Sequence, residues 1–71
     1  MYRYLVVLER VEQNYSAYAP DLPGCAATGA TREEAERAMH EAIELHVRGL
    51  LEDGLPIPAS DASAEYVAVR V

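Results

Sequence analysis

The sequence predicts an α+β fold in which three β-strands precede one α-helix and a fourth strand follows it, in the order β-β-β-α-β. Residues 2–9 are rich in β-branched, aromatic and other apolar residues, and valines alternate with other residues over 65–71, which is typical of strands. Apolar residues recur at a spacing of three and four over 32–53, which is typical of one helical face. A strand that follows a helix returns parallel to the first strand by a right-handed crossover. The predicted sheet is therefore mixed, four-stranded and ordered 3-2-1-4, with the helix on one face.

The first predicted strand, residues 2–9, carries apolar side chains on both of its faces. One face holds Tyr2, Tyr4, Val6 and Leu8, and the other holds Arg3, Leu5, Val7 and Glu9. An apolar centre on both faces indicates a strand inside a sheet that is covered on both sides. A polar hairpin connection over 10–14 leads to a second strand over 15–19, and a third short strand fits 25–28.

One helix can cover only one face of this sheet. The other face would remain wet and apolar in a monomer, which is the mark of an interaction surface. Tyrosine is enriched in the cores of protein interfaces. We therefore expect the exposed face to carry whichever tyrosines point outward among Tyr2, Tyr4, Tyr18 and Tyr66.

Prolines and glycines predict a tight corner between the second and third strands. Pro20 and Pro23 have fixed backbones, and Gly24 and Gly29 offer positions where a positive φ carries no steric penalty. The sequence around this corner carries Asp21, Leu22 and Cys25 but no arrangement typical of a catalytic centre.

The helix over residues 32–53 has both a start signal and a stop signal. Thr31 and Glu34 fit a capping box, in which the Thr31 side chain accepts the N–H of Glu34 and the Glu34 carboxylate accepts the N–H of Thr31. Gly54 supplies a left-handed stop, and the prolines that follow prevent the helix from resuming. Residues 57–63 are expected to form a loop before the fourth strand.

The length predicts one domain, residues 1–71, with a small core of its own. A chain of this size buries only about 60% of the surface that its unfolded form exposes. Its single cysteine allows no internal disulfide. Self-association is a usual remedy, so we expect at least a dimer. No basic leader segment and no apolar run of membrane-spanning length are visible, so we expect a cytoplasmic protein.

The charge balance argues against direct nucleic-acid binding. Twelve acidic residues against six basic ones give a net charge of −6, whereas proteins that bind phosphate backbones present stripes of Lys and Arg. An acidic surface suits a basic protein partner, because complementary potentials speed encounter. The acidity also fits plain solubility, and composition alone favours that interpretation over a basic partner.

The sequence offers no convincing catalytic, metal or cofactor site. A two-metal nuclease needs several carboxylates that converge, one of them normally in the middle of the first strand, but that strand centre is apolar. His40 and His46 are six residues apart and do not share a helix face as a metal pair. Cys25 has no basic neighbour in sequence and is expected to be a small buried side chain. We therefore predict a protein that is not an enzyme and that holds no metal or cofactor.

Several residues together resemble the N-terminal domain of the HicB-like antitoxin family. They are Tyr18-Ala19-Pro20, Asp21-Leu22-Pro23-Gly24-Cys25, Gly29-Ala30-Thr31, Glu33-Glu34-Ala35, Ala38 and Glu41-Ala42. The resemblance covers roughly residues 2 to 71. It implies a partial ribonuclease-H-like fold and a protein that neutralises a small HicA-type toxin that cleaves messenger RNA. Many members carry a DNA-binding segment after the last strand, and we expect none in this chain.

The resemblance implies a toxin–antitoxin system in which this chain binds a small basic ribonuclease and occludes it. The residues expected at the partner-binding surface are Glu9, Glu12, Tyr18, Asp21, Leu22 and Pro23. The carboxylates could mimic substrate phosphates while Tyr18 supplies contact area. Two alternatives stay open: Asp21 only braces its own turn, and the chain is a stand-alone oligomeric binding or scaffold domain with no toxin partner. A metal-dependent nuclease is the least favoured interpretation.

Overall fold

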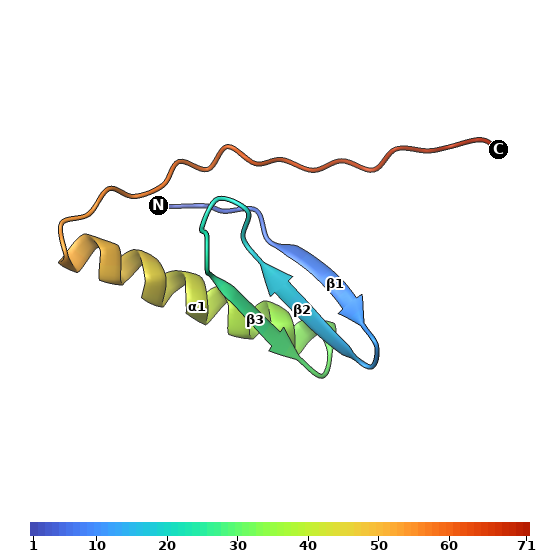
Figure 1. Cartoon of the computed structure of the whole chain (residues 1–71), viewed down its shortest axis with the longest axis horizontal. Coiled ribbons are helices and arrows are strands. Elements are labelled where there is room, and N and C mark those ends of the chain that lie inside the picture. The colour runs from blue at the N-terminus through green and yellow to red at the C-terminus, as the bar shows by residue number, and fades with distance from the viewer.

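The computed structural model describes residues 1–71. Three antiparallel strands, β1 (Val7–Val11), β2 (Asn14–Tyr18) and β3 (Ala26–Gly29), form a sheet in the order β1-β2-β3. One helix, α1 (Arg32–Glu52), packs across one face of this sheet, mainly over β3 and β2 (Figure 1). The α+β class and the predicted order of three strands followed by a helix are confirmed.

The structure contains no fourth strand. Residues 65–71 are extended but pair with no other segment, so the predicted mixed sheet in the order 3-2-1-4 is not formed within one chain. Figure 1 shows the chain leaving the end of α1, passing beside the N-terminal segment and running on past the sheet. An alternating pattern shows that a segment can form a strand. The segment forms one only where an unpaired sheet edge lies close enough to bond with it.

The first strand begins later than the sequence predicts. The β1–β2 pairing runs from Val7 opposite Tyr18 to Val11 opposite Asn14. Because the chain turns away after Tyr18, residues 2–6 have no partner strand beside them and remain outside the sheet. The predicted alternation of faces is nevertheless correct, because Tyr4, Val6 and Leu8 all pack against the core.

The corner between β2 and β3 is as tight as the prolines and glycines predict. The backbone N–H of Leu22 donates to the carbonyl of Ala19 at 3.0 Å, and the N–H of Cys25 donates to the carbonyl of Leu22 at 3.0 Å. Gly24 has φ +83, a conformation that glycine adopts without strain. Leu22 fixes the corner to the rest of the protein, since its side chain is buried in the core.

Half of the predicted capping box is present at the start of α1. The Thr31 hydroxyl accepts the N–H of Glu34 at 3.1 Å, as predicted. The Glu34 carboxylate, however, accepts the N–H of Ala30 at 2.9 Å and not that of Thr31. The carboxylate thus ties the helix to the residue before the cap. At the other end, Gly54 has φ +67, which confirms the left-handed stop.

The core lies between the sheet and α1 and is built mainly from small side chains. Its cluster of buried residues consists of Ala17, Ala19, Leu22, Cys25, Ala35 and Met39. Small residues let the helix approach β3 closely. Gly29 shows how closely, because a Cβ atom there would lie 2.5 Å from the backbone nitrogen of Ala35. Position 29 requires glycine because of this close approach. It does not require glycine for a positive φ, which the sequence suggested.

Candidate functional site

The face of the sheet opposite α1 presents a mixed polar and apolar surface, which we call the open face. Two rows across the three strands form it, and the pairing register places Val7, Tyr18 and Ala26 in one row and Glu9, Ser16 and Thr28 in the next. Tyr18 lies on the central strand and is 42% exposed. Its ring is therefore available for contact at the middle of the sheet.

Tyr18 is the tyrosine that points out from the open face. Tyr4 packs against the core on the helix side, and Tyr2 lies beside Ile43 and Val47 of α1. Of the four tyrosines that the sequence offers for the exposed face, Tyr2 and Tyr4 therefore lie on the helix side. Alternation along the strand places even-numbered residues of the first strand on the helix side, and only the structure shows which side that is.

Glu9 and Glu12 occupy the half of the sheet nearest the β1–β2 turn. Glu9 lies directly opposite Ser16 on the open face, one row from Tyr18. Glu12 forms the two-residue turn together with Gln13 and has φ +56, which is uncommon for a residue with a side chain. Such turns favour glycine at this position. The hairpin therefore presents an exposed carboxylate at a place where backbone geometry alone would select glycine.

The corner residues Asp21, Leu22 and Pro23 lie at the opposite end of the sheet from Glu12. Pro23 is exposed, whereas Leu22 is buried and cannot contact a partner directly. The Asp21 carboxylate accepts the backbone N–H of Ala62 at 2.8 Å, across 41 positions of sequence. Asp21 therefore braces a distant segment of the chain.

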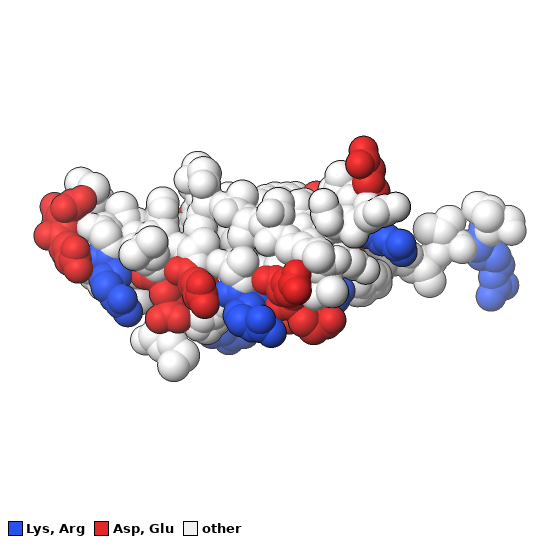
Figure 2. Space-filling model, turned by 90° about the horizontal axis from the view of Figure 1, so that it is seen from below, with Lys and Arg blue, Asp and Glu red and all other residues white.

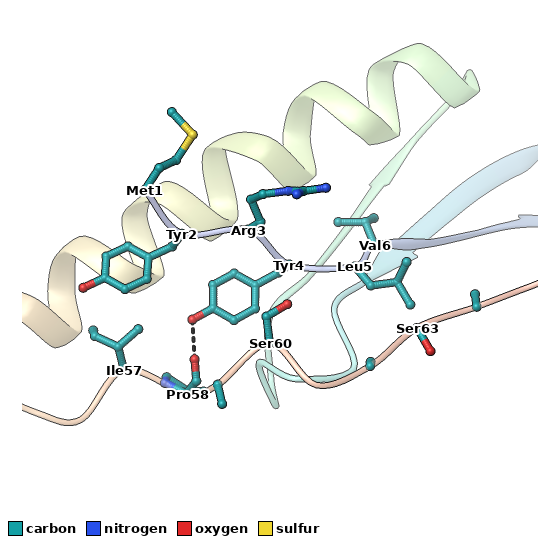
Figure 3. A pocket seen from close by; sticks show the side chains of 13 residues that line it. Met1, Tyr2, Arg3, Tyr4, Leu5, Val6, Ile57, Pro58, Ser60 and Ser63 are labelled. Carbon is teal, nitrogen blue, oxygen red and sulfur yellow. Dashed lines mark hydrogen bonds between the residues drawn. The ribbon is translucent and has the colours of Figure 1, made fainter.

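A groove separates the N-terminal segment from the chain that follows α1 (Figure 3). It has a volume of about 870 Å³, with residues 1–6 on one side and a stretch between 57 and 64 on the other. Tyr4 crosses it, and its hydroxyl donates to the carbonyl of Pro58 at 2.6 Å. Burial, followed by electrostatic repulsion from Tyr2 and Asp21, raises the pKa of the Tyr4 hydroxyl above its ordinary value.

The structure thus divides the predicted site residues into two groups. Glu9 and Tyr18 share the open face, with Glu12 at its turn end, while Asp21 and Pro23 lie beyond the other end. Pro58 and Ala62, which anchor the chain after α1, are not among the residues predicted from the sequence. Their anchoring bonds link residues more than 40 positions apart, and no sequence motif signals such a contact.

The outer surface of α1 is strongly charged but mixed in sign (Figure 2). The helix carries six glutamates and three arginines, and exposed pairs form one turn apart. Arg32 Nε lies 2.8 Å from Glu36 Oε1, and His40 Nε2 lies 2.7 Å from Glu44 Oε1. Exposed pairs of this kind contribute little to stability, so this surface serves chiefly to keep the helix hydrated.

The side chains that could support metal or nucleophilic chemistry lie apart. No three His, Cys, Asp or Glu residues come close enough together to hold a metal ion. His40 is exposed beside Glu44, and His46, six residues further along α1, is half-buried. Cys25 is buried, and burial raises the pKa of its thiol, which opposes formation of the reactive thiolate.

The helix is not long and apolar enough to span a membrane.

The chain is thus an acidic α+β unit with one face of its sheet exposed. Residues 4–70 match the family model of the HicB-like antitoxins of bacterial toxin–antitoxin systems. The chain therefore belongs to the HicB-like antitoxin family.

Relatives among curated proteins agree with this membership. A UPF0150 protein of Synechocystis is 36% identical over the whole chain and is itself covered over 91% of its length. An uncharacterised 14.9 kDa protein of Haemophilus phage HP1 is 38% identical over 90% of this chain, which spans 48% of that protein. A UPF0150 protein of Helicobacter pylori is 45% identical over 69% of this chain and is covered over 68% of its length. No solved structure matches.

Proposed function

We propose that this protein neutralises a small, basic, HicA-type toxin that cleaves messenger RNA, by binding it and blocking access to RNA. The observation that carries the proposal is the match of residues 4–70 to the antitoxin family. A net charge of −6 supports it, because an acidic protein attracts a basic ribonuclease and is repelled by the RNA that the ribonuclease would otherwise bind. In this role the chain acts in the cytoplasm, as an oligomer and not as an enzyme.

The open face and its turn form the binding surface in this proposal. Tyr18 supplies aromatic contact area at the centre, and Glu9 and Glu12 place carboxylates where they can pair with cationic side chains of the toxin. The strained backbone at Glu12 supports this role. A positive φ on a residue other than glycine costs of the order of 1 kcal/mol, and functional sites are common places for such strain.

The corner contributes differently. Leu22 anchors the corner in the core, Pro23 presents a rigid exposed ring, and Asp21 is already paired with the N–H of Ala62. A partner that contacts this end of the sheet would meet an ordered surface. Binding to it would therefore cost little conformational entropy.

A charge-reversal experiment tests the proposed surface. The Glu9→Lys/Glu12→Lys variant is to be compared with Glu33→Lys/Glu41→Lys, which changes the net charge equally but lies on α1, on the other side of the sheet. If the open face binds the toxin, the first variant loses inhibition of RNA cleavage, while the second retains inhibition and only slows association at low salt. Equal inhibition by both variants would exclude the carboxylates of the open face from the interface.

A further inference from the structure

The edge of β1 is unpaired in the single chain. β1 bonds to β2 on one side and to nothing on the other, and residues 1–6 form none of the backbone hydrogen bonds outside the helix and strands. An exposed strand edge is a template for another strand, and natural proteins usually protect it. Here no strand pairs with the edge, although residues 57–66 of the same chain run beside residues 1–8.

A partly apolar groove lies beside this edge, and we call it the edge groove. Its apolar lining residues are Tyr2, Tyr4, Val6, Leu8 and Ile43, and the remaining ones are Arg32, Glu36, His40 and Glu44. The groove exists because α1 lies mainly over β3 and β2 and leaves the β1 side of the layer incompletely filled. Side chains of a strand added beside β1 would fill it.

Residues 64–71, which we call the arm, have the properties of such a strand. Val67, Val69 and Val71 alternate with Ala68 and Arg70. Val67 is 74% exposed and Val69 75% exposed, although valine strongly favours a half-buried strand. The arm extends the molecule to 50 Å and raises its radius of gyration to 13.9 Å, against about 11 Å expected for a compact chain of this length.

Two hydrogen bonds fix the stretch before the arm beside the N-terminal segment and the corner, but no backbone hydrogen bond pairs this stretch with residues 1–6. Pro58 is bound by the Tyr4 hydroxyl and Ala62 by the Asp21 carboxylate. Figure 3 shows the Tyr4 side chain reaching from the N-terminal segment toward Pro58, so a side chain and not a backbone ladder joins the two segments. The end of the arm runs on past the sheet (Figure 1), where a second molecule can reach it.

We propose that the arm of one copy adds to the free β1 edge of a second copy, with Val67 and Val69 in the edge groove, and that the exchange is reciprocal. Reciprocal exchange gives a closed two-fold dimer in which both exposed edges are paired. Each sheet would then contain four strands, the fourth supplied by the partner. This inference rests on the proposed function in one respect only, because it specifies how the proposed oligomer is built.

Paired arm variants of the full chain test this exchange. Light scattering should give the parent protein twice the 7.8 kDa mass of the chain. The Val67→Asp/Val69→Asp variant should give the monomer mass, because carboxylates would have to enter the partly apolar edge groove. The control, Tyr66→Asp/Ala68→Asp, adds the same charge to the opposite face of the arm and should remain dimeric. Both pairs lie at exposed positions of the single chain, so neither threatens the monomer fold.

Isotope-filtered NMR on a mixture of labelled and unlabelled protein shows which copy donates the arm. Contacts between the methyl groups of Val67 or Val69 in one copy and Leu8 or Ile43 in the other support the exchange. The inference is overturned by a monomeric parent, or by contacts confined within one copy. A dimer that survives Val67→Asp/Val69→Asp also overturns it, but leaves the proposed oligomer intact. Toxin inhibition, assayed separately on the same variants, reports on the antitoxin function independently.

Discussion

Gly29 is the residue whose identity the packing fixes most strictly. A Cβ atom there would meet the backbone nitrogen of Ala35 at 2.5 Å and the Glu34 side chain at 2.8 Å. We expect Gly29→Ala to lower the free energy of unfolding by ~1–3 kcal/mol, because the helix must move away from β3. Gly49→Ala is the matched control, since its Cβ would meet nothing within 4 Å, and it should stabilise the helix by ~0.5–1 kcal/mol. Urea unfolding of both variants measures the difference, and equal effects would contradict the close approach.

Cys25 and Tyr4 make the stability of the protein sensitive to alkaline pH. Burial raises the pKa of both groups in the folded state, so the unfolded chain loses these protons first. Their contribution is complete below the ordinary pKa values and is lost as pH rises through the folded ones. We expect the free energy of unfolding to fall between about pH 8 and pH 10, where free thiols ionise. Cys25→Ala should flatten this fall in urea titrations, and an unchanged slope would show that the thiol is not protected.

The helix depends on its cap at Thr31. The Thr31 hydroxyl satisfies the N–H of Glu34 at 3.1 Å. Removing this acceptor leaves a donor of the first turn without its partner, so Thr31→Ala should lower the free energy of unfolding by ~0.5–2 kcal/mol. Thr31→Ser keeps the hydroxyl and serves as the control. Thermal unfolding distinguishes the two, and an unchanged midpoint for Thr31→Ala would mean that the cap is dispensable.

The chain after α1 depends on Asp21 as an anchor. Its carboxylate accepts the N–H of Ala62, which shields that amide from exchange with solvent. In Asp21→Ala, hydrogen exchange at Ala62 should accelerate roughly ten- to a hundredfold, since a bond to a charged group contributes ~1.5–3 kcal/mol. Asp61→Asn, which changes an exposed carboxylate next to the same amide, should leave the rate unaltered. No acceleration in Asp21→Ala would mean that the anchor is not maintained in solution.

Local signals in the sequence predicted the elements well and their long-range placement poorly. The helix boundaries followed from Thr31 and Gly54, whose caps are local interactions, and alternation correctly separated the two faces of the first strand. The prediction of a fourth strand was wrong for the single chain. Alternation over 65–71 indicates that the segment can pair with a strand, but it does not indicate where the partner edge lies. The site was predicted in the same partial way. Glu9 and Tyr18 share a face by register, but the use of Asp21 as an anchor depends on a tertiary contact.

The whole molecule combines a small core with an unpaired strand edge and an exposed sheet face, each of which a partner can cover. Only seven of its residues are buried, and the free edge of β1 and the open face lie on different sides of the molecule. A second copy at the edge would leave the open face accessible to a toxin. Self-association and toxin binding are therefore compatible, and variants of the arm and of Glu9 and Glu12 should affect them separately.

The most direct test is RNA cleavage by a small basic HicA-type ribonuclease, measured with and without an equimolar amount of this chain. Neutralisation by occlusion predicts that cleavage stops once the two proteins are equimolar. It also predicts that cleavage returns when Glu9→Lys/Glu12→Lys replaces the parent, because the opposing charges that hold the toxin on the open face are lost. Cleavage that continues unchanged in the presence of excess parent protein would contradict the antitoxin function.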